Sequence, residues 1–198
     1  MTALDDAVAV SQGWDVPHAS VAVVTADGRT AASAGDQDRV YRLASVTKLL
    51  SAYAALVAVE EGALSLDQPA GPPGATVEHL LAHTAGYDFS STTLRAGPGE
   101  RRLYSNTGFE VLADLLESET GIAFDAYAQE AVFAPLGMAH TSIGDSAAAG
   151  GSSTTADLAR FAAELQQPRL LDPATLERAT GVSFPGRRGV LPGFGQQP

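Results

Sequence analysis

The sequence predicts an α+β chain in which a β-hairpin precedes a long helical stretch. Residues 18–24 are rich in β-branched side chains, and the Asp27-Gly28 pair that follows is a strong signal for a tight hairpin turn. From about Ala44 the apolar residues follow the period of a helix. Apolar residues make up 45% of the 198 and charged residues 18%, so a hydrophobic core can form, and we expect one domain.

The predicted elements follow one another without an internal repeat or a domain linker. Apolar and polar residues alternate weakly over residues 3–11, which we expect to form a helix. Residues 29–34 are expected to form the second strand of the hairpin. Further helices are expected at 77–82, 107–120, 124–133 and 155–166. Small residues at 147–153 predict a flexible loop, and the tail from 181 to 198 is rich in Gly, Pro and Arg.

The strongest predicted helix runs from Ser45 to Glu61, with Gly62 at the position after its end. Apolar residues lie on nearly every side of it: Val46, Leu49, Leu50, Ala54, Leu56, Val57 and Val59. A helix that is apolar all round is usually buried. We therefore expect this helix to run through the middle of the protein.

The first candidate for chemistry is Ser45-Val-Thr-Lys48, at the start of that helix. Residues three apart share a helix face, so the Lys48 amine can approach the Ser45 hydroxyl. A serine hydroxyl is a weak nucleophile until a base accepts its proton, and a lysine that burial keeps neutral can be that base. The amino terminus of the helix adds a positive field where negative charge develops. The simpler interpretation, in which Ser45 is an N-cap and Lys48 lies on the surface, is the usual one for this motif alone.

The second candidate is Tyr104-Ser105-Asn106, directly before a predicted helix. The simpler interpretation is a helix start, with Thr107 and Glu110 forming a capping box. It does not explain Tyr104, whose phenol can take part in a proton relay near a lysine. The Asn106 amide can hold a substrate carbonyl.

In this order, the two motifs resemble those of the family of serine β-lactamases, penicillin-binding proteins, D-Ala-D-Ala carboxypeptidases and related esterases. The Tyr form of the second motif looks like class C β-lactamases. Further segments similar to the family extend the resemblance over roughly Ser20 to Leu165: residues 61–67, 80–86, 133–138 and 153–158. The resemblance implies an α+β, α/β sandwich-like fold of the β-lactamase/transpeptidase kind, with an antiparallel sheet lobe and a large helical lobe. We expect a single domain over residues 1–198, with the sheet lobe at about 1–43 and the helical lobe at about 44–180.

The resemblance also implies the role of each motif residue. Ser45 would be acylated by the substrate, and Lys48 and Tyr104 would shuttle the proton, first from Ser45 and later from the water that releases the acyl group. Asn106 would orient Lys48 or the substrate amide, and the Ser45 backbone N–H would form half of the oxyanion hole. The expected substrate is a small molecule with an ester, amide or β-lactam carbonyl, since the motifs do not separate these classes. The lack of a visible export signal favours an esterase-like hydrolase.

Family members carry a third motif, Lys-Thr-Gly or His-x-Gly, on a late strand, and none follows Leu165. We therefore expect a truncated form whose C-terminal strands are missing. The hairpin then has few partners, and its open edge favours self-association. The missing motif also leaves open a non-catalytic relative that binds a ligand or partner, although the four intact motif residues oppose this alternative.

Composition limits the other function classes. The net charge of −11 argues against nucleic acids and anionic membranes, and the lack of Cys excludes thiolate metal sites. His79 and His83 are four apart, but a turn sequence follows them, so we expect no metal site. The sequence contains no glycine-rich phosphate-binding loop, so we expect no cofactor. The amino terminus does not resemble a signal peptide, and residues 49–59 are too few to span a bilayer, so a cytoplasmic protein is expected.

Overall fold

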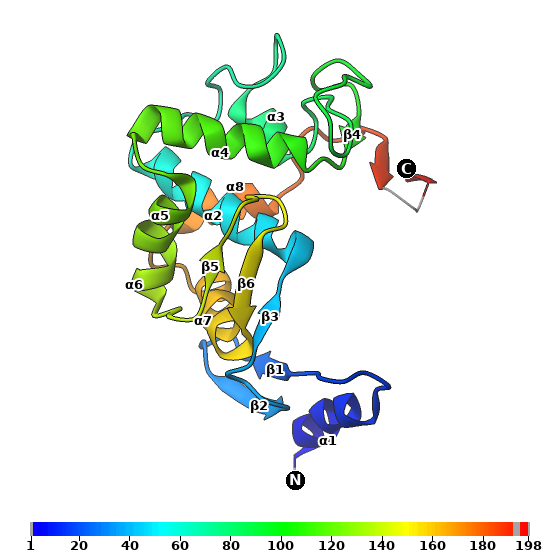
Figure 1. The fold of residues 1–198 in the computed structure, drawn as a ribbon, viewed down its shortest axis with the longest axis vertical. Coiled ribbons are helices and arrows are strands. Elements are labelled where there is room, and N and C mark those ends of the chain that lie inside the picture. The colour runs from blue at the N-terminus through cyan, green and yellow to red at the C-terminus, as the bar shows by residue number, and fades with distance from the viewer. Residues whose placement is uncertain (1, 192–194, 198) are drawn as a thin grey trace.

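The structure, a computed structural model, describes residues 2–191 and 195–197. It confirms the predicted α+β fold, in an elongated molecule with a helical end and a small β-hairpin end (Figure 1). The longer helices are α2 (Thr47–Glu60), α4 (Thr107–Thr120), α7 (Thr155–Gln166) and α8 (Pro173–Thr180). The shorter helices are α1 (Ala3–Ala9), η1 (Val10–Gly13), η2 (Ala44–Val46), α3 (Val77–Leu81), α5 (Phe124–Ala128), η3 (Gln129–Phe133) and α6 (Ala134–Leu136). None of the helices in the described part of the chain is long and apolar enough to cross a membrane.

The predicted N-terminal hairpin is present as β1 (Val21–Val24) and β2 (Thr30–Ala34), which pair antiparallel. Its turn contains Gly28, whose φ of +78° suits a residue without a side chain. Helix α1 packs on β2 and α7 packs on β1, so helices support this two-stranded sheet. A small apolar cluster joins Val8 of α1 to the buried side chains of β2.

A second sheet, in the order β3-β6-β5, was not predicted from the sequence. Its strands are β3 (Val40–Arg42), β5 (Ser142–Ile143) and β6 (Gly151–Thr154). The predicted loop at 147–153 is therefore wrong in its last residues, which form the central strand. Gly, Ser and Thr give this strand no apolar alternation, which is why it resembled a loop. Gly151 is required by packing, because an added Cβ would lie 2.6 Å from the Thr47 Oγ1 atom.

Helix α2 is the centre of the helical end, as predicted. Ten of its fourteen residues are buried, and Gly62 follows its end with a φ of +76°. The prediction of burial on every side is wrong at the amino-terminal end, because Val46 is 44% exposed and Leu49 is 57% exposed. That end emerges from the core beside the turn η2, which contains Ser45.

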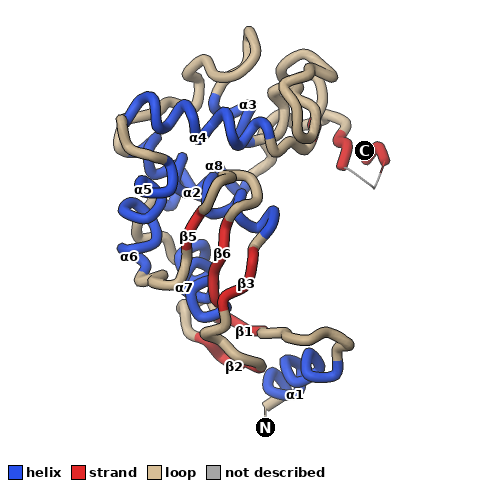
Figure 2. Tube along the Cα trace, in the orientation of Figure 1, coloured by secondary structure: helices blue, strands red, loops and turns tan. Residues whose placement is uncertain are grey.

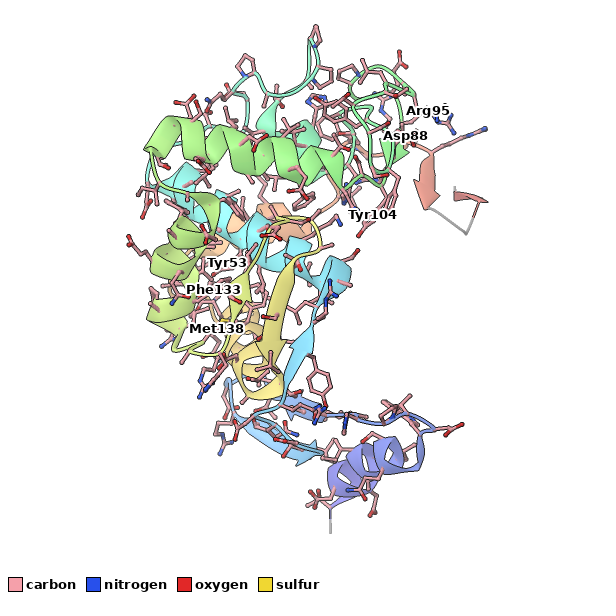
Figure 3. The ribbon with its side chains drawn as sticks, viewed as in Figure 1. Tyr53, Asp88, Arg95, Tyr104, Phe133 and Met138 are labelled. Atoms are coloured by element: carbon pink, nitrogen blue, oxygen red, sulfur yellow. The ribbon has the colours of Figure 1, made fainter. Side chains whose placement is uncertain are left out.

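The core around α2 joins helices from distant parts of the sequence. Tyr53 packs edge-on against Phe161 of α7, with 5.3 Å between the ring centroids. Phe133 and Met138 are fully buried in the same cluster, and their side chains lie with Tyr53 inside the helical end (Figure 3). The predicted helix at 124–133 continues to 136, but its middle, η3, is a π-helical turn.

The tail forms a third sheet with a strand that precedes α4. In the order β4-β7-β8, its strands are β4 (Arg102–Leu103), β7 (Gly189–Leu191) and β8 (Gly195–Gln197). Most of the chain between α3 and β4 is loop, and this loop lies beside the third sheet (Figure 2). The tail thus returns to the region of the Tyr104 motif.

Candidate active site

Ser45 lies in the 3₁₀ turn η2, immediately before α2, and is exposed. Its neighbour Ala44 has a φ of +46°, in the left-handed region that residues with a side chain rarely adopt. The Thr47 hydroxyl donates to the Ala44 carbonyl at 2.6 Å and accepts from the Gly151 N–H at 2.9 Å. Strand β6 therefore fixes the turn that presents Ser45.

Lys48 is buried, with only 5% of its surface exposed. Its Nζ donates to Asn106 Oδ1 at 2.6 Å and to the Ala148 carbonyl at 3.0 Å. The interpretation of Lys48 as a surface residue is therefore wrong. Ser45 is not an N-cap either, since α2 is capped by Val46 without a side-chain hydrogen bond.

Tyr104 lies against Lys48, with the ammonium nitrogen 4.7 Å from the centre of its ring. The ring has an aromatic neighbour in His83, 4.5 Å away between centroids, and another in Phe89, 6.1 Å away and nearly parallel. Tyr104 lies at the amino-terminal end of α4 (Figure 3). The structure thus brings both sequence motifs together across 58 residues of chain.

His83 is a part of the site to which sequence reasoning assigned no role. Its φ is +57°, and its Nδ1 accepts the Ser105 N–H at 3.2 Å, which places the proton of a neutral ring on Nε2. Burial, with the positive charges of Lys48 and Arg102, lowers the pKa of His83 to about 4. A neutral ring therefore lies beside Tyr104 at neutral pH. The sequence pointed to His83 in two ways, through the similarity of residues 80–86 to the family and through its spacing from His79, and neither indicated a place beside Tyr104.

The start of α4 differs from the predicted capping box. The Ser105 hydroxyl accepts the Gly108 N–H at 3.2 Å and donates to the Asp88 carbonyl at 2.7 Å. Glu110 does not return to the start of its helix but reaches the loop before β6. Its carboxylate accepts from the Ser146 hydroxyl and from the N–H groups of Ala147, at 3.1 Å, and Ala148, at 3.4 Å.

The structure shows no hydrogen bond between Ser45 and Lys48 among the described residues, and it gives His79 and His83 different surroundings. The Ser45 hydroxyl makes no hydrogen bond within residues 2–191 and 195–197, so its contact with Lys48 stays a prediction. His79 and His83 face different partners, since His79 binds the Thr76 hydroxyl through Nδ1 at 2.9 Å and stacks on Phe184. Among the described residues, no three His, Asp or Glu side chains gather as metal ligands.

Comparison with known proteins gives this arrangement a family. The family model for β-lactamases matches residues 7–195, nearly the whole chain. The chain belongs to the β-lactamase family. This β-lactamase-family chain also resembles a β-lactamase from Mycobacterium bovis in crystal structure, at 51% identity and a TM-score of 0.94, over 96% of this chain and 71% of that one.

Curated relatives of this β-lactamase-family chain are more distant. The D-alanyl-D-alanine-carboxypeptidase/endopeptidase AmpH of Escherichia coli is 28% identical over 52% of this chain and 37% of AmpH. Penicillin-binding protein 4* of Bacillus subtilis is 26% identical over 52% of this chain and 30% of that protein. This chain thus matches about a third of the length of these relatives.

Proposed function

We propose that this chain is a serine hydrolase that forms an acyl-enzyme on Ser45. The observation that carries the proposal is the buried amine of Lys48, which lies one helical turn after the exposed Ser45. Asn106 and the Ala148 carbonyl hold this amine by hydrogen bonds. A buried lysine without a carboxylate partner is unfavourable for a purely structural role. A role as the proton acceptor for Ser45 explains why this lysine is buried there.

Lys48 would accept the proton of Ser45 in its neutral form, and its two contacts determine where the lone pair of that form points. A neutral amine has two N–H donors and one lone pair, and Asn106 Oδ1 and the Ala148 carbonyl can each accept one donor. The lone pair is then left for the proton of Ser45. Loss of that proton lets the Ser45 oxygen bond to the substrate carbonyl carbon.

The proton then moves from Lys48 to the leaving group, whose bond to the carbonyl carbon breaks as the acyl-enzyme forms. The Tyr104 ring stabilises the transient ammonium through its π-face, and its phenol offers a second route for the proton. A water molecule next gives its proton to the same relay and attacks the acyl carbon, which releases the acid and restores Ser45.

Three substrate classes fit this chemistry: small carboxylic esters, D-amino-acid peptides and β-lactams. All three pass through the same acyl-enzyme, and the relatives named above include a D-alanyl-D-alanine carboxypeptidase/endopeptidase and a β-lactamase. We propose a small carbonyl substrate of one of these classes.

Steady-state turnover tests the proposal. The wild-type chain and Ser45→Ala are assayed with a p-nitrophenyl ester, a penicillin and a D-Ala-D-Ala peptide. Turnover of at least one substrate that is lost in Ser45→Ala supports the proposal, and the substrate that reacts identifies the class. No Ser45-dependent turnover of any of the three, by protein shown to be folded, contradicts the proposal and favours a non-catalytic relative.

A further inference from the structure

We infer that Glu110 is a positioning residue for Lys48 and acts through the peptide groups of Ala147 and Ala148. This inference rests on the proposed function, because its purpose is to aim the amine that activates Ser45. Glu110 touches neither Ser45 nor Lys48 through any hydrogen bond among the described residues, so its effect must pass through the loop.

The Glu110 carboxylate binds one side of the loop before β6. It accepts three hydrogen bonds there, from the Ser146 hydroxyl and from the N–H groups of Ala147 and Ala148. The Ser146 hydroxyl also accepts from the Ala148 N–H at 3.2 Å and from the Ala149 N–H at 3.1 Å. Glu110 and Ser146 together therefore fix the N–H groups of this loop.

The carbonyls of the same two residues face α2. The Ala147 carbonyl accepts from the Ser51 hydroxyl at 2.7 Å, and the Ala148 carbonyl accepts from Lys48 Nζ at 3.0 Å. Ala147 and Ala148 are buried but carry only methyl side chains. Since such small side chains anchor a loop weakly, the position of the Ala148 carbonyl depends on the hydrogen bonds of its backbone.

The amino-terminal part of α4 thereby contacts both acceptors of the Lys48 amine or their neighbours. Asn106, its N-cap, accepts directly from Lys48. Glu110, four residues later on the same helix face, holds the N–H of Ala148, the residue whose carbonyl accepts the second N–H. One rigid element thus fixes both N–H directions of the amine. If Glu110 is removed, two amide donors in the loop lose an acceptor and the Ala148 carbonyl is free to move.

The acylation rate tests this inference against the substrate identified by turnover. Because a displacement of about 1 Å in a catalytic group can slow a reaction about 10²-fold, we expect Glu110→Ala to slow acylation by roughly that factor with KM changed by less than about threefold. Glu110→Gln can still accept from the amides and donate to the Ser146 hydroxyl, so it should restore most of the rate. Glu117→Ala, an exposed carboxylate on the same helix, is the matched control and should react like wild type.

A second readout is independent of activity. The Cε and Nζ resonances of Lys48 should shift in Glu110→Ala and return toward their wild-type values in Glu110→Gln, with no change in Glu117→Ala.

If wild type is never acylated, the proposed function fails and these resonances alone decide the role of Glu110. If Glu110→Ala does not fold, Ser146→Ala should also shift these resonances, because it removes the hydrogen bonds of the Ser146 hydroxyl with Glu110 and with the N–H groups of Ala148 and Ala149. Unchanged Lys48 resonances in folded Glu110→Ala or Ser146→Ala, or an unchanged acylation rate in Glu110→Ala, would overturn the inference.

Discussion

Ala44 adopts a left-handed backbone conformation directly before the proposed nucleophile. Such a conformation is unfavourable by about 1–2 kcal/mol for a residue with a Cβ atom and persists where the surrounding structure enforces it. Here the Thr47 hydroxyl, bound to the Ala44 carbonyl, enforces it. The strain lies at the site where Ser45 must be presented.

A larger, β-branched side chain should make this strain measurable. We predict that Ala44→Val lowers the free energy of unfolding by about 1–3 kcal/mol, because valine is poorer than alanine at positive φ. Urea denaturation measures the change. Ala31→Val, at an exposed position of β2, is the control and should change stability by about 0.5 kcal/mol or less. Equal stability of the two variants would contradict this account of Ala44.

His83 should make the stability of the protein depend on pH between about 4 and 6.5. Its pKa is lowered to about 4 in the folded protein from an ordinary value of 6.5, so the unfolded chain binds more protons in this window. Its contribution is therefore complete above pH 6.5 and is lost as the pH falls toward 4, by roughly 3 kcal/mol at about 1.4 kcal/mol per pKa unit.

The matched variant is His83→Asn, which tolerates positive φ and can still accept the Ser105 N–H. We predict that its free energy of unfolding falls less than that of wild type between pH 6.5 and 4. Urea denaturation at both pH values measures this. Parallel pH profiles of the two proteins would show that His83 does not titrate as the structure indicates.

Helix α2 provides a direct comparison of a buried and an exposed leucine on neighbouring positions. Leu50 is fully buried and Leu49 is 57% exposed. We predict that Leu50→Ala lowers the free energy of unfolding by about 2–5 kcal/mol, through lost burial and a cavity. Leu49→Ala should cost about 0.5 kcal/mol or less. Equal losses on urea denaturation would contradict the packing of α2.

Helix α7 ends with a buried carboxylate, Glu164, that holds the following loop. Its Oε1 accepts from the Tyr53 hydroxyl at 2.7 Å and from the N–H groups of Arg169, at 2.7 Å, and Leu170, at 2.8 Å. Burial raises the pKa of Glu164, but these hydrogen bonds outweigh burial, so the pKa lies below its ordinary value of 4.5. Its ionised form therefore stabilises the fold above pH 4.5, and this contribution is lost as the pH falls below that value.

We predict that Glu164→Gln is less stable than wild type at pH 7 by about 1–3 kcal/mol. The difference should shrink as the pH falls below 4.5, because the wild-type carboxylate then becomes protonated. Urea denaturation at pH 7 and at pH 3.5 to 4 compares the two. A difference that stays constant or grows at low pH would contradict the ionised state of Glu164.

The helices were easier to predict from the sequence than the strands, for a physical reason. The helices at 107–120 and 155–166 match the structure because an apolar stripe of helical period fixes the face that they bury. Strands β3, β5 and β6 are two to four residues long and depend on pairing between distant segments. A single short segment does not carry that information.

In the candidate site, too, the sequence predicted what local motifs determine and missed what depends on contacts between distant segments. Two short motifs were enough to select Ser45, Lys48, Tyr104 and Asn106 as candidates, and the structure joins the last three. For Glu110 the sequence offered only a capping box with Thr107, as the simpler interpretation of a local pattern. The tertiary structure shows instead that Glu110 holds a loop 36 to 38 residues away. The ring of His83 beside Tyr104 is likewise a product of the fold.

The described strands form three separate small sheets, and the outer strands of each sheet have an unpaired edge. Within the described residues, β1 and β2 pair only with each other, and helices α1 and α7 support them. We predict that the chain self-associates through this hairpin, because an unpaired strand edge offers free backbone groups to a second copy. Sedimentation velocity over a wide range of protein concentrations should show a mass that rises with concentration. A constant monomeric mass would contradict this prediction.

The central claim is that Ser45 is acylated with Lys48 as its proton acceptor. Intact-protein mass after timed incubation with a penicillin and with an activated ester tests both parts, in wild type, Ser45→Ala and Lys48→Met. The account predicts an adduct on wild type, none on Ser45→Ala, and formation at least about 10²-fold slower on folded Lys48→Met. An adduct that survives in Ser45→Ala, or one that forms on Lys48→Met as fast as on wild type, would contradict it.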